Sequence, residues 1–325
     1  MIIWYKGEFV MKEQKENNVL NKINFKTIFP YLGLLGVVVF FQIYSGGRVL
    51  SVTNFKAIIS ECFFIIIGVT GYIFIMAQGN LDFSIGSVMG LCCATSAVGA
   101  GIHPLLAIPF AVIPGIIAGY VNGFVHVKLK IGSLIGTMSV QYIINGILVL
   151  SLAGGSLTAP ISMLGWNTMA VKFIVIILVL FTGFYVFRYT AYGKRCRAIG
   201  SCAEAARQSG VKVGKLKIIA FMTVGAISGL LGFFSLIRTG TSTVLTGSEL
   251  FMNVLCAALL GGIPLSGGAG TKFSSAVIGS LTMAFLTNGM VLMGLNSYDK
   301  QLIKGIVFLI TIAISFDRKN LVVIK

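Results

Sequence analysis

Long apolar stretches alternate with short polar ones along most of this 325-residue chain. Ten apolar segments can be read, roughly at residues 29–45, 57–78, 84–101, 104–126, 131–153, 171–187, 217–237, 250–263, 273–295 and 301–316. A helix needs about 20 residues to cross the hydrocarbon core of a bilayer, and the segment at 250–263 is short for that task. The pattern therefore predicts an all-α polytopic membrane protein with about ten transmembrane or partly re-entrant helices.

The composition supports this fold class. Charged residues make up 10% of the chain and the mean hydropathy is +0.95, whereas a soluble domain carries about 25% charged residues. The 40 glycines suit membrane helices, because small residues allow close packing. The formal net charge of +16 could indicate a nucleic-acid partner, but lysines and arginines at cytoplasmic helix ends explain it better. We expect no nucleic-acid partner.

The distribution of basic residues predicts how the chain is oriented. With the N-terminus inside and every segment crossing, 19 Lys and Arg lie on the cytoplasmic side and six, including Lys300 and Lys304, lie outside. A re-entrant segment at 250–263 changes these numbers to 17 and eight, so ten crossings fit the positive-inside bias better. This predicts a multi-pass membrane protein with both termini in the cytoplasm. A basic cytoplasmic tail at 1–28 and a cytoplasmic tail at 317–325 flank a transmembrane domain at 29–316.

Two loops stand out from this pattern. A basic stretch at 188–217 separates two apolar segments and should lie on the cytoplasmic membrane surface, where a soluble partner can bind it. It contains Glu204-Ala205-Ala206-Arg207, and we expect the nearby Gly210 to end a short helix with a positive φ. The longest outer loop contains Trp166, which we interpret as an interfacial anchor or as part of a docking surface for an external protein.

Polar breaks between apolar segments are the first places to look for a solute pathway, because irregular backbone at membrane depth is tolerated only next to protein or water. One break contains Asp82 and Ser84, and a second, Pro264-Leu-Ser-Gly-Gly268, resembles it. Asp82 is predicted to cap the following helix or to act in passage or gating of a solute. Glu61 is the other acid within an apolar segment, and it can reach the interface.

Amide side chains within the apolar segments are further candidates for the pathway. They are Gln141, Asn145, Asn253 and Asn288. Gln141 and Asn145 are four residues apart and share one helix face. Such groups either bind the hydroxyls of a sugar or hydrogen-bond a neighbouring helix.

The sequence contains no pattern typical of an enzyme. His103 and His126, the two histidines, have no acidic or cysteine neighbours at metal-ligand spacing. No phosphate-binding loop of the type G-x-x-x-x-G-K-[ST] is present. We therefore predict no catalytic residues, no metal and no cofactor in this chain. If ATP drives the protein, another polypeptide binds the ATP and its magnesium.

Three stretches, in consistent order, resemble the ribose-type sugar permeases of ABC importers, the branch for ribose, xylose, galactose and autoinducer 2. The first is Gly79-Asn-Leu-Asp-Phe-Ser-Ile-Gly-Ser87, with one extra residue before the aspartate. The second runs from Arg188-Tyr-Thr-Ala-Tyr-Gly-Lys194 through Ala198-Ile-Gly200 to Glu204-Ala-Ala-Arg-Gln-Ser-Gly210. The third is Leu260-Gly-Gly-Ile-Pro-Leu-Ser-Gly-Gly-Ala-Gly270, where Ile263-Pro264 departs from the family's Thr-Ser.

The resemblance covers roughly residues 55–316 and implies a permease subunit of the bacterial cytoplasmic membrane that does no covalent chemistry. It implies three protein partners: an ABC ATPase subunit, an extracytoplasmic solute-binding protein, and a second permease subunit in a homo- or heterodimer. The substrate implied is a sugar or sugar-like solute. The ATPase-coupling residues it implies are Gly200, Glu204, Ala205, Ala206, Arg207 and Gly210. The alternative is an ion-coupled secondary transporter of a small polar solute, which would need a carboxylate such as Asp82 or Glu61 at mid-membrane.

Overall fold

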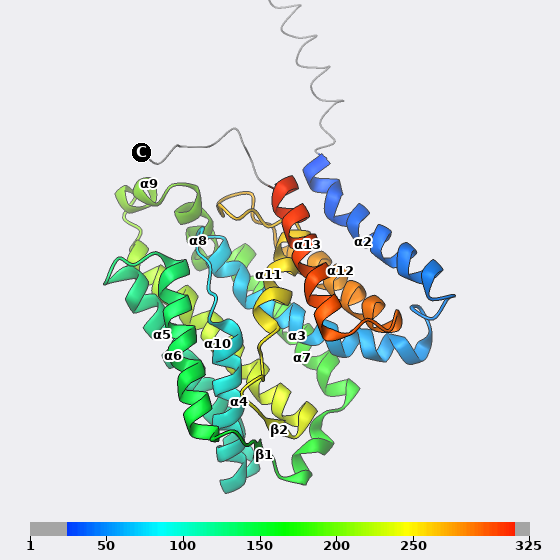
Figure 1. Cartoon of the computed structure of the whole chain (residues 1–325). Coiled ribbons are helices and arrows are strands. Elements are labelled where there is room, and N and C mark those ends of the chain that lie inside the picture. The colour runs from blue at the N-terminus through cyan, green and yellow to red at the C-terminus, as the bar shows by residue number, and fades with distance from the viewer. Residues whose placement is uncertain (1–24, 316–325) are drawn as a thin grey trace, which may run out of the picture.

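The computed structural model describes residues 25–315, most of which are helical (Figure 1). The α-helices are α2 (Phe25–Tyr44), α3 (Val52–Met76), α4 (Ile85–Ile102), α5 (Ala107–Val127), α6 (Ser133–Leu152), α7 (Met169–Tyr189), α8 (Ala191–Ser201), α9 (Ala203–Gln208), α10 (Val213–Thr239), α11 (Leu250–Leu260), α12 (Phe273–Leu292) and α13 (Ser297–Ser315). Two 3-10 helices, η1 (Pro104–Leu106) and η2 (Ile161–Trp166), lie in loops. The strands β1 (Leu157–Thr158) and β2 (Thr241–Ser242) form an antiparallel ribbon, in which Leu157 pairs with Ser242.

Each of the ten predicted apolar segments forms a helix, and the all-α polytopic class is confirmed. In the described part of the chain, seven helical stretches are long and apolar enough to cross a membrane: α3, α4, η1 with α5, α6, α7, α10 and α12. By contrast, α11 has 11 residues, which at 1.5 Å per residue span about 17 Å. This helix is too short to cross a bilayer on its own, and the number of crossings beyond seven stays a prediction.

The two ends of the helical bundle differ in what they carry. Figure 1 shows α8, α9, the beginning of α2 and the end of α13 at one end, which we call the α8–α9 side. The ribbon of β1 and β2 lies at the opposite end, which we call the ribbon side. The start of α2 and the end of α13, which are the ends nearest the chain termini, thus lie on the same side of the bundle. The predicted orientation, with both termini in the cytoplasm, requires this. The predicted tails at 1–28 and 317–325 lie almost wholly outside the described residues.

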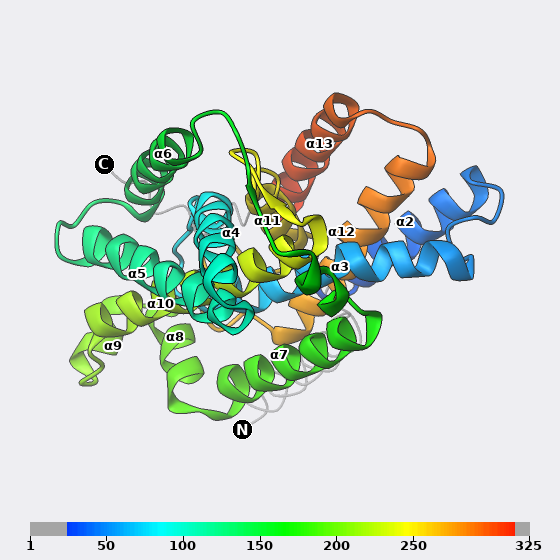
Figure 2. The same ribbon diagram turned by 90° about the horizontal axis from the view of Figure 1, so that it is seen from below.

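The helix α3 forms the centre of the core. All its side chains from Cys62 to Met76 are buried, between α7, α10, α11 and α12. Glycines bring other helices into backbone contact: a Cβ on Gly115 of α5 would overlap the carbonyl oxygen of Gly225 in α10. Such contacts are how membrane helices associate when lipid offers no hydrophobic driving force. Seen from the ribbon side in Figure 2, α6 and α13 stand on either side of α4 and α11.

Candidate functional site

The chain between α3 and α4 is irregular, and it leads from the α8–α9 side into the bundle. As a result α4 begins about halfway toward the ribbon side (Figure 1). Side chains accept all four consecutive backbone N–H groups of residues 81–84: Leu81 to Ser133 Oγ at 3.4 Å, Asp82 to the Tyr72 hydroxyl at 2.9 Å, Phe83 to Thr137 Oγ1 at 3.0 Å and Ser84 to Asp82 Oδ1 at 2.8 Å. Backbone groups at membrane depth need such partners, so α3 and α6 hold this segment in a defined position.

Asp82 is 2% exposed, and its carboxylate contacts Ser84 and Asn122. Its Oδ1 accepts the backbone N–H of Ser84 at 2.8 Å and the Ser84 hydroxyl at 2.7 Å. Asn122 of α5 donates to Ser84 Oγ at 2.7 Å and lies 3.5 Å from Asp82 Oδ2. The N-cap residue of α4 is Ser84, and no side-chain capping bond reaches the N–H groups of its first turn. Asp82 therefore does not cap α4 as predicted; its carboxylate instead binds the N–H and hydroxyl of the N-cap residue and fixes the turn before the helix. Whether the charge also acts in transport stays a prediction.

A second irregular segment, residues 243–249, meets the first one inside the bundle. A Cβ on Gly86 would overlap the carbonyl oxygen of Gly247 and would lie 3.7 Å from the backbone nitrogen of Phe251. The rings of Phe83 and Phe251 are 4.2 Å apart between centroids. The first turns of α4 and α11 are thus in contact, with their N-terminal dipole ends at one place. We call this contact between the starts of α4 and α11 the crossing of the two helices. The sequence pattern did not predict it, although the run Thr246-Gly-Ser-Glu249 before a short apolar segment was a signal for it.

An ion pair lies next to this crossing. Lys304 Nζ is 2.8 Å from Glu249 Oε2, and the lysine side chain is 3% exposed while the glutamate side chain is 48% exposed. Lys304 is the eighth residue of α13, so it lies deeper than the outer helix end predicted for it. Charges at this depth are costly unless they are paired. The pair links α13 to the start of α11.

The predicted pathway amides fall in two places. Gln141 and Asn145 are half-buried on α6, and they continue the four-residue spacing of Ser133 and Thr137, which bind the first break. Asn253 is buried one turn after Glu249 in α11. Asn253 thus lies on one of the two helices that meet, whereas Gln141 and Asn145 lie on α6, which holds the first break.

Asn288 and Glu61 lie elsewhere. Asn288 exchanges two hydrogen bonds with Asn54, at 2.8 and 3.0 Å, and so joins α12 to the first turn of α3. This contact is the helix–helix bonding that we considered as the alternative role. Glu61 forms an ion pair with Arg238 at 3.8 Å, and the Arg238 guanidinium also lies over the ring of Phe64, 5.1 Å from its centroid.

The basic loop folds into α8 and α9, and α9 presents the predicted coupling residues. Glu204 and Arg207 form an exposed ion pair at 3.6 Å, which is weak and leaves both side chains open to a partner. Ala205 is exposed, whereas Ala206 is buried in a cluster with Ile199, Val213 and Leu216 that fixes α9 on α8 and α10.

Gly210 ends this turn with a φ of +79°. The next N–H group, that of Val211, bonds back to the Ala206 carbonyl at 3.0 Å. The predicted positive φ is confirmed.

The C-terminal end of α8, next to α9, touches both breaks that the sequence pattern singled out. A Cβ on Gly200 would overlap the carbonyl oxygen of Ala77 and would lie 2.5 Å from the nitrogen of Gly268. The N–H of Gly268 bonds to the carbonyl of Ala77 at 2.9 Å, and the N–H of Ala269 bonds to Ser201 Oγ at 3.1 Å. The turns at 77–79 and 264–270 therefore form one junction with the C-terminal end of α8.

Gln78 adds two contacts to this junction. Its Nε2 lies 3.1 Å from the sulfur of Cys196 in α8 and 3.4 Å from the carbonyl oxygen of Leu216 in α10. Burial raises the pKa of the Cys196 thiol to about 11, so the sulfur is a neutral thiol in this contact. From Gln78 the chain runs only four residues to Asp82, so the surface helices and the centre of the bundle are directly connected.

Comparisons with known proteins show which family this chain belongs to. The family described as "Branched-chain amino acid transport system / permease component" matches residues 54–312. The chain belongs to this permease family. The permease is 30% identical over 276 residues to the autoinducer 2 import system permease protein LsrC of Yersinia pseudotuberculosis serotype IB, a match that covers 80% of this chain and 76% of the relative. It is 31% identical, with the same coverage, to LsrC of Yersinia pestis strain Pestoides F.

These findings confirm the resemblance to ribose-type ABC importer permeases. The permease is thus a multi-pass membrane component of a sugar-type import system. No solved structure matches this chain.

Proposed function

We propose that this permease moves a small sugar-like solute into the cell by alternating access, driven by a separate ABC ATPase that docks on α8 and α9. The observation that carries the proposal is the junction of Gly200 with Ala77 and Gly268. A force applied to α8 reaches the backbone of both turns without a flexible side chain in between. One of these turns continues to Asp82 and α4, and the other follows α11.

The docking surface has the chemistry that a soluble partner needs. Exposed basic residues of α8 (Lys194, Arg195) stand beside the exposed face of α9, and the permease has no phosphate-binding loop of its own. We infer that the partner supplies ATP binding, magnesium and hydrolysis. With α8 and α9 on the cytoplasmic side, the described ends of α2 and α13 also face the cytoplasm (Figure 1).

The crossing of α4 and α11 is the proposed centre of the pathway. Both helices begin there, and half-helices that meet inside a membrane are a recurrent way to build a solute site. Gly86 and Gly247 are in backbone contact, so a small shift of either segment opens or closes the space between them. Glu249, about half exposed, and the amides Gln141 and Asn145 provide polar groups alongside.

The proposed substrate is small, neutral and rich in hydroxyl groups. Hydroxyl and amide side chains, rather than free charges, dominate the polar positions near the crossing, since Asp82 is engaged by Ser84 and Glu249 by Lys304. The Yersinia relatives are named for autoinducer 2 import, and this solute and ribose are the first two candidates.

Two further partners follow from the proposal. On the ribbon side, the loop that contains η2 exposes Ile161 (84%), which an extracytoplasmic solute-binding protein would cover. A second permease subunit would complete the pathway from the face that α6 and α13 flank (Figure 2).

The ATP-driven proposal and the alternative of an ion-coupled secondary transporter predict opposite results in an uptake experiment. The results expected for the ATP-driven proposal are these. Membrane vesicles with internal ATP and collapsed ion gradients should take up radiolabelled ribose or autoinducer 2 when a binding protein is present. Vesicles with an ion gradient and no ATP should not. Purification of the tagged permease in mild detergent should recover an ATPase. Uptake driven by the gradient alone, with no ATPase recovered, would establish the alternative.

A further inference from the structure

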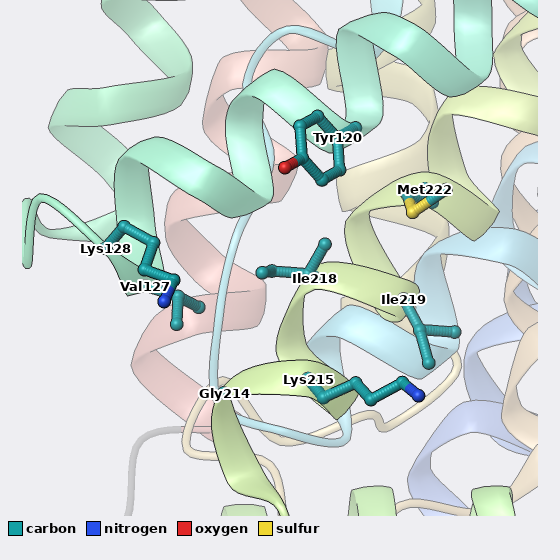
Figure 3. Close-up of a pocket in the computed structure, with 8 residues that line it drawn as sticks. All are labelled: Tyr120, Val127, Lys128, Gly214, Lys215, Ile218, Ile219 and Met222. Atoms are coloured by element: carbon teal, nitrogen blue, oxygen red, sulfur yellow. The ribbon is translucent and has the colours of Figure 1, made fainter.

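A groove opens between the end of α5 and the start of α10, on the α8–α9 side of the bundle. Its volume is about 540 Å³, and Tyr120, Val127, Lys128, Gly214, Lys215, Ile218, Ile219 and Met222 line it (Figure 3). The helices come together at its base because Gly214 has no side chain, and a Cβ there would lie 2.9 Å from Val127 Cγ1. None of these residues belongs to the crossing or to α8 and α9.

The groove is apolar along its length and has one lysine on either side, Lys128 at the end of α5 and Lys215 on α10 (Figure 3). In Figure 3, Tyr120 and Met222 lie at the end opposite Lys215. From Lys215 to Met222 is seven residues, and from Lys128 back to Tyr120 is eight, which correspond to about 10–12 Å of helix. The apolar part therefore extends from the level of the lysines well into the membrane-spanning parts of α5 and α10.

Within residues 25–315, Lys128 and Lys215 have no acidic partner. Both are exposed. The neighbouring basic residues Lys217 and His126 contact each other instead, since Lys217 Nζ lies 3.1 Å from His126 Nε2. In addition, no side chain caps the first turn of α10, which begins beside Lys215, so the positive end of its dipole adds to the two charges.

We propose that this groove binds an anionic phospholipid, with the headgroup phosphate between Lys128 and Lys215 and an acyl chain along Ile218 and Met222. A lipid fits better than a soluble protein because α5 also exposes Ile113, Ile117 and Val121 on its outer surface, which places the groove at the lipid-facing side of two spanning helices. Paired basic residues at the headgroup level beside an apolar channel are the chemistry that retains anionic lipids.

The test is native mass spectrometry of the purified full-length permease, titrated with phosphatidylglycerol or with phosphatidylcholine of the same acyl chains. Wild type should bind phosphatidylglycerol about tenfold more tightly, since two lysines contribute to the headgroup contact. The double variant Lys128→Gln/Lys215→Gln should bind both lipids alike. The matched control Lys194→Gln/Arg195→Gln removes two exposed charges on α8 and should keep the preference.

A third variant tests the apolar part of the groove without changing charge. Ile218→Trp fills the channel and should weaken the binding of phosphatidylglycerol severalfold, with the helical content unchanged by circular dichroism. Equal binding of the two lipids by wild type would overturn the proposal. Equal loss in both double variants, or unchanged binding in Ile218→Trp, would also do so. The assay needs neither ATP nor substrate, so its outcome is independent of the proposed transport function.

Discussion

Gly200 of α8 lies directly against the carbonyl group of Ala77, with no room for a side-chain carbon between them. Ala77 follows the last residue of α3 and begins the segment that carries Asp82. The nitrogen of Gly268 closes the other side of the same contact. A surface helix is thus seated on the backbone that leads to the centre of the bundle.

Gly200→Ala should therefore displace α8 from this junction. Overpacking of this kind costs about 1–3 kcal/mol, and we expect a lower unfolding temperature in detergent together with reduced solute uptake per permease. Gly146→Ala is the matched control, because Gly146 lies in α6 with nothing within 4 Å of an added Cβ. The control should unfold at the wild-type temperature or slightly above it. Identical behaviour of the two variants would refute the rigid junction.

Ala205 and Ala206 are adjacent, but one is exposed and the other is buried. Ala205→Trp should leave the unfolding temperature unchanged and lower both ATPase co-purification and uptake by at least about tenfold, because a large ring blocks the docking face. Ala206→Trp should instead destabilise the α8–α9 region by about 1–3 kcal/mol. Normal uptake by Ala205→Trp would contradict docking on α9.

The helices were predictable because membrane crossing demands long apolar segments, which few other structures need. The irregular segment before α4 was also predictable, since Asp82, Ser84 and the glycines around them suit a break rather than a helix interior. Gly210 likewise carried its own signal, because glycine readily adopts a positive φ. In each case the information is local in the chain.

Features that depend on contacts between distant residues could not be predicted in this way. The contact of Gly86 with Gly247 joins segments that are 161 positions apart. The sequence of neither segment indicates that it packs against the other. Lys304 was predicted at an outer helix end because hydropathy does not show that Glu249 provides a partner at depth. Of the two irregular segments in the candidate site, the one before α4 was predicted from the sequence. The other, residues 243–249, was recognised only from its packing in the structure.

Asp82→Asn should be mild. The substituted amide keeps an oxygen for the N–H and hydroxyl of Ser84, and it changes only the second position of the carboxylate, where the contact with Asn122 Nδ2 is long, at 3.5 Å. Asp82→Ala leaves these groups unsatisfied, and we expect a loss of about 1–3 kcal/mol with less assembled protein. Uptake per assembled complex separates the roles: if Asp82→Asn abolishes uptake at normal protein levels, then the charge itself acts in transport.

Removing either partner of the ion pair between Glu249 and Lys304 should lower the stability of the protein, but by different amounts. Glu249→Gln leaves a buried, unpaired ammonium group and should destabilise the protein by about 3 kcal/mol. Lys304→Met leaves a half-exposed carboxylate and should cost less. The double variant should recover stability to the level of Lys304→Met. Thermal unfolding of all three measures this, and equal effects of the two single variants would show that burial of Lys304 does not govern the pair.

The native cysteines offer a test of orientation. Cys202, between α8 and α9, is exposed, whereas the other five are buried, and burial keeps the pKa of Cys196 at about 11. Because maleimides react with the thiolate, an impermeant maleimide at pH 7 should modify Cys202 alone. The reaction should occur in permeabilised cells and not in intact ones.

Two variants complete the orientation test. Cys202→Ser should abolish the labelling of permeabilised cells. When Ser162→Cys is added to that variant, the new cysteine in the exposed part of η2 should react in intact cells, because the ribbon side faces outward. Labelling of Cys202 from outside intact cells would reverse the orientation of the whole bundle. In that case α8 and α9 could not dock a cytoplasmic ATPase.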